Sequence, residues 1–255
     1  MKRMHFRPAV MAIVFAGLCS ASLQAAEVQV AVAANFAVPL RQIAEDFSRH
    51  SGHTLRVSSG ATGKLYAQIV NGAPFEVFLS ADSTTPERLE KEGQVVAGSR
   101  YTYAVGRLVL WSAQVGVVDE KGEILNTGPF RYLALANPKT APYGAAAVEV
   151  LEARGLYARL QDKYVQGENI AQTHQFVASG NAEIGFVALS QVWQDGKLTG
   201  GSAWRVPPEL HAPIRQDAAL LKRGEANAAA RAILDYLKSE PARRVIAAYG
   251  YGFCS

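Results

Sequence analysis

The chain has 255 residues, of which 49% are hydrophobic and 19% charged, a composition typical of a folded globular protein and not of a disordered or fibrous one. This length suits one large domain or two small ones. The formal net charge is +4, but without Lys2, Arg3 and Arg7 the chain carries 23 basic and 22 acidic residues. A nearly neutral protein gives no electrostatic reason to expect a nucleic acid or an anionic membrane as partner.

The first 25 residues have the three parts of a secretory signal peptide. The basic start 1–7 is followed by an apolar run, 9–18, and by small residues up to Ala25. The apolar run is too short to cross a membrane as a helix. We therefore predict an exported, periplasmic protein that loses residues 1–25 and keeps one cysteine, Cys254.

The next part of the chain alternates between strand and helix patterns. Residues 28–34 predict a strand, and Asn35 then stands as the N-cap of a helix with apolar residues at helical spacing. The predicted strands 54–58 and 75–79 flank a second helix, which starts near Leu65. Strand, helix, strand, helix and strand in this order predict a parallel sheet with right-handed crossovers.

A second αβ block follows a long β-like run, 101–111. Its predicted elements are a strand at 132–136, helices at 143–154 and 169–179, a strand at 183–189, extended segments at 203–214 and 218–221, and helices at 227–239 and 241–249. Two such blocks predict an α/β protein with two discontinuous lobes, 26–105 plus 206–255 and 106–205, joined by hinge strands with a cleft between them.

The common catalytic and metal-binding patterns are missing from the sequence. The four histidines after the signal peptide have neither metal-ligand spacing nor a cysteine partner, and they are His50, His53, His174 and His211. The segment 60–65 resembles a phosphate-binding loop, but only two residues separate its first glycine from Gly63-Lys64, where that loop has four. We predict no enzyme, no cofactor and no metal held directly by side chains.

One feature recurs at the points where a loop ends and a predicted helix begins. Asn35, Ala61–Thr62, Tyr143 and Asn169–Ile170 all stand at such positions, and three of the helices follow short strands. Helix N-termini carry unpaired N–H groups and partial positive charge, so they bind anions without a lysine or arginine. Each residue taken alone is an ordinary cap. Together, with two ends from each lobe, they predict a cleft for a small, fully ionised oxyanion.

Short stretches along nearly the whole mature chain carry a family resemblance. They are Ala33-Ala34-Asn35-Phe36, the loop 59–65, the segments 71–74 and 78–82, Asn137-Pro138 with 141–144, residues 185–188, and the tail 235–238 with 249–253. In these stretches the chain resembles the periplasmic molybdate-binding proteins of ABC import systems. The resemblance implies a type II two-lobed periplasmic-binding-protein fold that closes around molybdate or tungstate. It also implies a monomer that delivers this oxyanion to the membrane subunit of a transporter.

The resemblance implies ligand contacts through hydroxyl, amide and backbone N–H groups. The matching positions are Asn35, Thr62, Tyr143 and the backbone N–H of Ile170, with Ala34 and Ala61 beside the first two. Some members have a ligand-contacting tyrosine where this chain has Ala188, and the hydroxyl of Tyr143 would supply the missing group from the opposite loop. Lys64, at the start of the second helix, is expected to be solvated.

Other functions remain open on the sequence. The same cleft could hold sulfate, phosphate or an iron-bearing anion, although iron would require tyrosine, histidine or carboxylate ligands in these loops. An exported hydrolase could use Ser59 or Thr62 as nucleophile, but no histidine lies in these loops to act as base. An adhesion module would be expected to show repeats, and the sequence has none.

Overall fold

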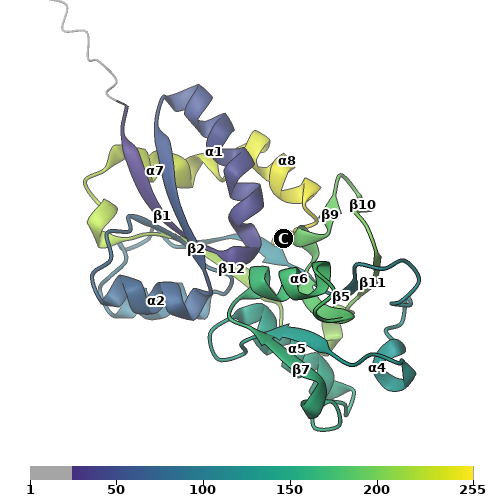
Figure 1. Ribbon diagram of the computed structural model, residues 1–255. Coiled ribbons are helices and arrows are strands. Elements are labelled where there is room, and N and C mark those ends of the chain that lie inside the picture. Colours follow the sequence, from purple (N-terminus) through teal and green to yellow (C-terminus); the bar gives the residue numbers. More distant parts are fainter. Residues whose placement is uncertain (1–24, 255) are drawn as a thin grey trace, which may run out of the picture.

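The computed structural model describes residues 25–254, so the predicted signal peptide lies outside the described residues except for Ala25. The chain alternates between strands and helices and forms two five-stranded sheets (Figure 1). The predicted α/β class is therefore confirmed. None of the helices within 25–254 is both long and apolar enough to cross a membrane.

The first sheet has the strand order β2-β1-β3-β12-β4. Its strands are β1 (Glu27–Ala33), β2 (Thr54–Gly60), β3 (Val77–Leu79), β4 (Tyr101–Gly106) and β12 (Ile214–Leu220). The first three are parallel, while β12 runs antiparallel to both β3 and β4. The carboxyl ends of β1, β2 and β3 therefore lie at one edge of this sheet, where the loops to the next helices begin.

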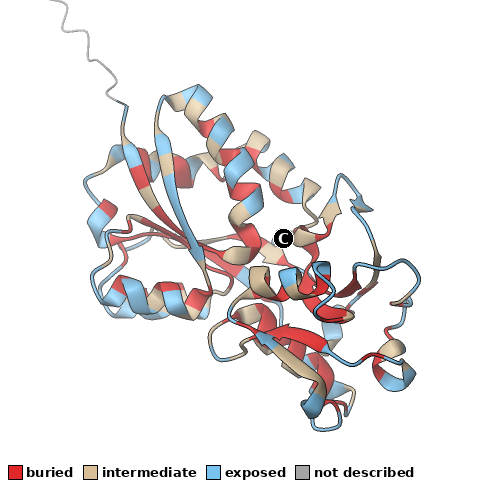
Figure 2. Cartoon of the chain, in the orientation of Figure 1, coloured by how far each residue is buried: buried red, intermediate tan, exposed pale blue. Residues whose placement is uncertain are grey.

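Helices cover both faces of the first sheet. They are α1 (Ala37–Ser51), α2 (Thr62–Val70), α3 (Thr84–Lys91), α7 (Ala228–Tyr236) and α8 (Glu240–Ala248). Buried residues of α1, α7 and α8, such as Leu40, Ile233 and Ile246, share one core cluster. Leu65 of α2 and Leu89 of α3 belong to another. Figure 2 shows the buried residues gathered along the strands and the inner sides of these helices.

The second sheet has the order β11-β5-β8-β6-β7. Its strands are β5 (Leu108–Ser112), β6 (Leu133–Ala136), β7 (Tyr164–Gly167), β8 (Ile184–Ala188) and β11 (Ser202–Arg205), and its helices are α4 (Ile124–Thr127), α5 (Pro142–Ala153) and α6 (Ile170–Ala178). Val150 of α5 and Val177 of α6 lie in separate core clusters. A small hairpin, β9 (Trp193–Gln194) and β10 (Lys197–Leu198), follows β8.

Two segments join the sheets. Strand β4 passes into β5 at Arg107, and residues 206–213 lead from β11 back to β12. The predicted single run 101–111 is therefore two strands that belong to different sheets. We propose that the two sheets are the cores of the lobes 26–105 plus 206–255 and 106–205.

Some elements differ from the sequence-based expectation. Helix α3 was not predicted because only Pro86 and Leu89 of its eight residues are buried, so the apolar repeat is weak. Strand β7 and the hairpin β9–β10 are too short for a periodic pattern. Asn35 is not the N-cap of α1: it lies in a short 3₁₀ turn, and its side chain caps no helix N–H.

Candidate functional site

The carboxyl edges of the two sheets face each other across a small cavity. Only about 10 Å³ of it admits the centre of a water molecule. Six of the seven predicted site residues line this interlobe cavity, namely Ala34, Asn35, Ala61, Thr62, Tyr143 and Ile170. The other lining residues are Ala33, Gly60, Ala81, Ala141, Pro142 and Asn169.

Ala188, the seventh predicted position, is not among these lining residues. It is fully buried at the end of β8, where it pairs with Leu108, and its N–H donates to Gln191 Oε1 at 3.0 Å. The structure therefore does not bring Ala188 to the cavity. The Gln191 side chain thus accepts the N–H of the last residue of β8, and its Nε2 donates to the Ile170 carbonyl.

The start of α2 offers a hydroxyl donor to the cavity. Thr62 is 1% exposed, and its Oγ1 accepts the N–H of Ala81 at 3.1 Å. A hydroxyl that accepts one hydrogen bond keeps its own proton to donate elsewhere. Because the bond from the Ala81 N–H uses only a lone pair of the Thr62 oxygen, the Thr62 O–H remains available to an acceptor in the cavity.

Backbone N–H groups from three helices point to the same place. In α2 the N–H groups of Gly63, Lys64 and Leu65 bond to carbonyls, and in α6 those of Ala171 and Gln172 bond to the Asn169 side chain. Such bonds satisfy most of the free donors at a helix start. Among the described residues, the donors left over are the N–H groups of Thr62, Tyr143 and Ile170. Asn169 is thus an ordinary cap, as its type suggests.

Asn35 lies at the centre of a group of buried polar side chains behind the cavity. Its Nδ2 donates to Gln216 Oε1 and to the Tyr251 hydroxyl, each at 2.9 Å. Ser190 Oγ donates to the Asn35 carbonyl at 3.0 Å. We name the set the interlobe network, and its members are Asn35, Tyr103, Tyr143, Ser190, Gln216 and Tyr251.

The hydroxyl of Tyr143 points to the hinge. Gln216 Nε2 donates to it at 3.0 Å, and a Cβ atom on Gly106 would lie 2.1 Å from it. The bond from Gln216 leaves the proton of this hydroxyl available, so its role in place of a group missing at Ala188 stays a prediction. Tyr143 also brings its backbone N–H to the start of α5.

No charged side chain is among the described residues that line the interlobe cavity. Burial raises the pKa of Tyr143 and of Tyr103 well above the usual value near 10, and burial raises the pKa of Tyr251 as well. The tyrosines around the cavity are therefore neutral at physiological pH. An anion here would meet dipoles of N–H and O–H groups instead of an opposite full charge.

This neutrality predicts how binding depends on pH. We expect the affinity for a fully ionised oxyanion to stay constant within about twofold from pH 6 to pH 9, because no group in the cavity titrates there. Isothermal titration across this range checks it. A tenfold change in affinity between pH 6 and pH 9 would contradict the neutral site.

The raised pKa values of the buried tyrosines affect the free energy of unfolding instead. Their stabilising contribution is complete below pH 10, the unfolded value, and it is lost as the pH rises towards the folded-state pKa.

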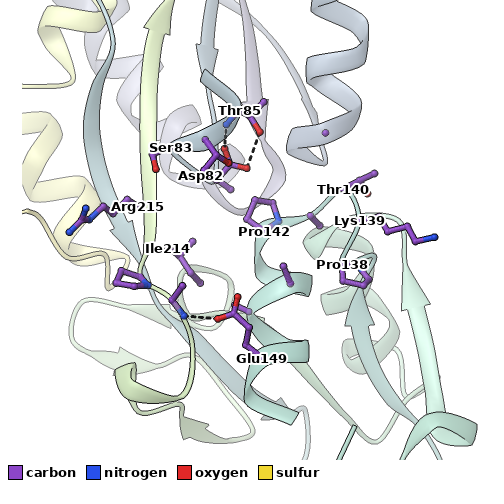
Figure 3. Close-up of a pocket in the computed structure, with 18 residues that line it drawn as sticks. Asp82, Ser83, Thr85, Pro138, Lys139, Thr140, Pro142, Glu149, Ile214 and Arg215 are labelled. Carbon is purple, nitrogen blue, oxygen red and sulfur yellow. Dashed lines mark hydrogen bonds between the residues drawn. The ribbon is translucent and has the colours of Figure 1, made fainter. Parts of the chain in front are cut away.

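A larger groove lies beside the cavity and shares Ala81, Ala141 and Pro142 with it (Figure 3). Its volume is about 330 Å³, and Asp82 and Glu149 are among its lining residues. Asp82 accepts the N–H and the hydroxyl of Thr85, and Glu149 accepts the N–H of Ala212 at 2.6 Å. Lys139 and Arg215 line the groove as well, so it presents both signs of charge. The smaller cavity has no carboxylate to repel an oxyanion and is the better candidate.

The lobes touch each other around the cavity. The N–H of Gly63 in α2 donates to the carbonyl of Thr140, before α5, at 2.9 Å. Lys64 is about half exposed, in line with the expectation that it is solvated, but it also forms an ion pair with Glu168 of the other lobe. Both partners are about half exposed, so the pair adds little to stability. The structure is thus the closed arrangement of the two lobes.

Sequence reasoning missed the supporting residues of the site. Gln216, Ser190 and Tyr251 lie far from Asn35 along the chain, and of these three only Tyr251 belongs to a stretch that carries the family resemblance, the tail 249–253. Gln216 stands within an ordinary antiparallel strand. Only the crossing of β12 behind the loop after β1 places it against Asn35, so no local signal could have identified it.

Comparisons with known proteins agree with this architecture. A family profile described as "Bacterial extracellular solute-binding protein" matches residues 28–252. The molybdate-binding protein ModA of Azotobacter vinelandii is 62% identical over 237 residues, covering 93% of this chain and 94% of that protein. ModA of Rhodobacter capsulatus is 52% identical and covers 89% of this chain and 88% of that protein.

A solved structure shows the same fold. The periplasmic molybdate-binding protein of Azotobacter vinelandii superposes with a TM-score of 0.87 at 42% identity, over 89% of this chain and all of that one. The predicted two-lobed periplasmic-binding-protein fold is therefore confirmed. With the profile match over most of its length and relatives of this identity, the chain belongs to the bacterial extracellular solute-binding proteins, in the family of the molybdate-binding ModA proteins.

Proposed function

We propose that this protein captures molybdate, or tungstate, in the interlobe cavity and delivers it to an ABC importer. The observation that carries the proposal is the convergence of three helix N-termini from both lobes, those of α2, α5 and α6, on one cavity lined by neutral groups. The names of its ModA relatives support molybdate as the ligand.

The donor set suits a fully ionised tetrahedral oxyanion. The N–H groups of Thr62, Tyr143 and Ile170 and the Thr62 hydroxyl belong to residues that line one small space, together with Asn35. Hydrogen bonds to a charged acceptor contribute about 1.5–3 kcal/mol each. Because the carboxylates of the neighbouring groove lie outside the cavity, nothing in the lining repels a dianion.

Delivery of the oxyanion to the importer depends on closure of the two lobes. Ligand donors come from both lobes, so a bound oxyanion favours the closed arrangement, which the membrane subunit of the importer would recognise. We also propose that the protein acts as a monomer. We further propose that residues 1–25 direct export to the periplasm, and that the near-neutral charge leaves no role for a nucleic acid.

The cavity supports binding and not catalysis. A hydrolytic role for the Thr62 hydroxyl would need a base beside it. Its described contact is the N–H of Ala81, and neither a histidine nor a carboxylate is among the residues that line the cavity. Groups of three or more potential metal ligands are not found within residues 25–254 either. We propose that molybdenum binds as an oxyanion, as transported cargo, which the names of the ModA relatives support.

Thermal unfolding of the mature chain with four anions tests the ligand. At a ligand concentration 1,000 times the dissociation constant, binding adds about 4 kcal/mol to the free energy of unfolding. For a chain of this size we expect molybdate and tungstate to raise the midpoint by about 8–16 °C. Sulfate and phosphate at the same concentration are expected to leave it within about 2 °C.

The other outcomes are equally informative. A large shift with sulfate or phosphate, and none with molybdate, would keep the anion cavity but overturn the proposed cargo. No shift with any of the four anions would overturn oxyanion capture itself. Product formed from a phosphate or carboxylate ester by the mature chain, and lost in Thr62→Val, would favour the hydrolase instead.

A further inference from the structure

The interlobe network joins the ligand loop to the hinge and to the opposite lobe. Gln216, in the strand β12 that returns from the second lobe, is fully buried. Its Oε1 accepts from Asn35 Nδ2 at 2.9 Å and from the Tyr103 hydroxyl at 3.0 Å, and its Nε2 donates to the Tyr143 hydroxyl. Gln216 therefore touches the cavity through Asn35 and the second lobe through Tyr143.

One atom of the network has no partner. Asn35 is 2% exposed and lines the cavity, and its Oδ1 makes no hydrogen bond with the described residues. An unpaired buried acceptor is unfavourable by about 1–3 kcal/mol. An oxyanion in the cavity would make the situation worse, because an oxygen of the ligand would face an oxygen of Asn35 instead of a donor.

Reversing two side-chain amides removes this conflict. If the amides of Asn35 and Gln216 each turn by half a rotation, nitrogen and oxygen exchange places and every heavy-atom distance is kept. Gln216 Nε2 then donates to Asn35 Oδ1 and to the Tyr103 hydroxyl, and Tyr103 still donates to the Ser80 carbonyl, which lies at 3.2 Å.

The rest of the network rearranges with the reversal. Gln216 Oε1 receives the proton of the Tyr143 hydroxyl, and Asn35 Oδ1 receives that of Tyr251. The Tyr251 hydroxyl then no longer donates to the Asn35 carbonyl or to Ser190 Oγ. Ser190 keeps its bond to the Asn35 carbonyl. Asn35 Nδ2 then occupies the place of the unpaired oxygen, where a ligand oxygen can accept from it. Both side-chain amides have partners in this arrangement once the oxyanion is present, and the cost is one contact without a proton, between the Tyr251 oxygen and the Asn35 carbonyl at 2.9 Å.

We propose that Gln216 is a positioning residue for the ligand, which fixes the Asn35 amide with its NH₂ group towards the oxyanion through a reversed pair of amides in the bound protein. This inference rests on the proposed function. It extends that function by linking the ligand to the Tyr143 hydroxyl of the second lobe through Asn35 and Gln216. Oxyanion binding and lobe closure thereby share one chain of hydrogen bonds.

A double-mutant cycle tests the role of Gln216. Gln216→Met keeps the length of the side chain but removes both its donor and its acceptor. We expect molybdate to bind about tenfold to a hundredfold more weakly in isothermal titration, and Gln216→Met to have less than a twofold effect in an Asn35→Ala background. The matched control is Thr102→Val, which removes the bond between the Thr102 hydroxyl and Asp217, the neighbour of Gln216 in β12. Its affinity is expected to stay within about threefold.

A direct readout of amide orientation completes the experiment. In the molybdate-bound protein labelled with ¹⁵N, the side-chain NH₂ protons of Gln216 should show nuclear Overhauser contacts to the ring of Tyr103 and none to the ring of Tyr143. Contacts to Tyr143 instead would overturn the reversal. An equal effect of Gln216→Met with and without Asn35, or an equal loss in Thr102→Val, would overturn the positioning role.

The two proposals fail in different ways. If the unaltered chain does not bind molybdate, the proposed function is wrong. If it binds molybdate and Gln216→Met binds equally well, the oxyanion site stands and only the role of Gln216 is overturned.

Discussion

Replacing Gly106 by alanine is expected to weaken molybdate binding by a hundredfold or more while leaving the two lobes folded. Gly106 ends β4, immediately before the crossing to the second lobe. A Cβ atom there would lie 2.1 Å from the Tyr143 hydroxyl and 2.6 Å from Gln216 Nε2. Neither atom belongs to a freely moving chain end, because both side chains are buried. The methyl group therefore opposes the closed arrangement, in which Tyr143 of α5 meets Gly106, whereas Gln216 lies beside Gly106 within the first sheet in either arrangement.

Affinity falls in proportion to the fraction of protein that can close, so a small steric cost in the closed form becomes a large change in the dissociation constant. Isothermal titration with molybdate and the thermal midpoint without ligand are the two measurements. Gly252→Ala is a matched control beside the hinge, where the nearest atom to a new Cβ lies at 3.7 Å. The double variant Gly106→Ala/Tyr143→Phe removes the closest clash and should recover part of the affinity. Unaltered binding by Gly106→Ala would contradict this account of closure.

Replacing Ile170 by proline is expected to weaken molybdate binding by about tenfold to a hundredfold through the loss of one backbone donor. Ile170 is the first residue of α6, where proline is well tolerated because the N–H has no partner inside the helix. The preceding residue, Asn169, has the extended backbone that proline requires of its neighbour, with φ −146° and ψ 175°. The substitution thus removes the proposed ligand contact and leaves the helix in place.

Ile170→Ala is the control for this variant. It keeps the N–H but loses the buried side chain, which is 4% exposed in the wild-type protein. The difference in molybdate affinity between the proline and alanine variants isolates the contribution of the N–H group, about 1.5–3 kcal/mol for a bond to a charged acceptor. Equal affinities in the two variants would show that this N–H does not bind the oxyanion.

Both variants probe a site built from neutral dipoles. Three helix N-termini contribute fractional positive charges, and Lys64, in the first turn of α2, is paired with Glu168. Such an arrangement favours a dianion only when the lobes bring all donors together. Opening the cleft separates the donors of α2 from those of α5 and α6, which gives a physical route to release at the transporter.

Local sequence patterns predicted most of the secondary structure and the place of the site. Apolar repeats at helical spacing identified α1, α2, α5 and α6, and the order of elements indicated two αβ blocks. Because strands in such blocks end at one edge, the loops at Asn35, Thr62, Tyr143 and Ile170 were expected to meet. The structure lines one cavity with all four. Their role in binding molybdate stays a prediction.

The tertiary structure alone decided how these residues are oriented. The hydroxyl of Tyr143 turns to the hinge because Gln216, 73 residues away in the chain, donates to it there. Ala188 stays within its sheet, and Asn35 joins Gln216 and Tyr251 instead of capping a helix. Sequence periodicity reports which face of an element is buried, but it carries no information on which distant polar group lies opposite. That pairing arises only when the lobes close and the hinge strands cross behind the ligand loop.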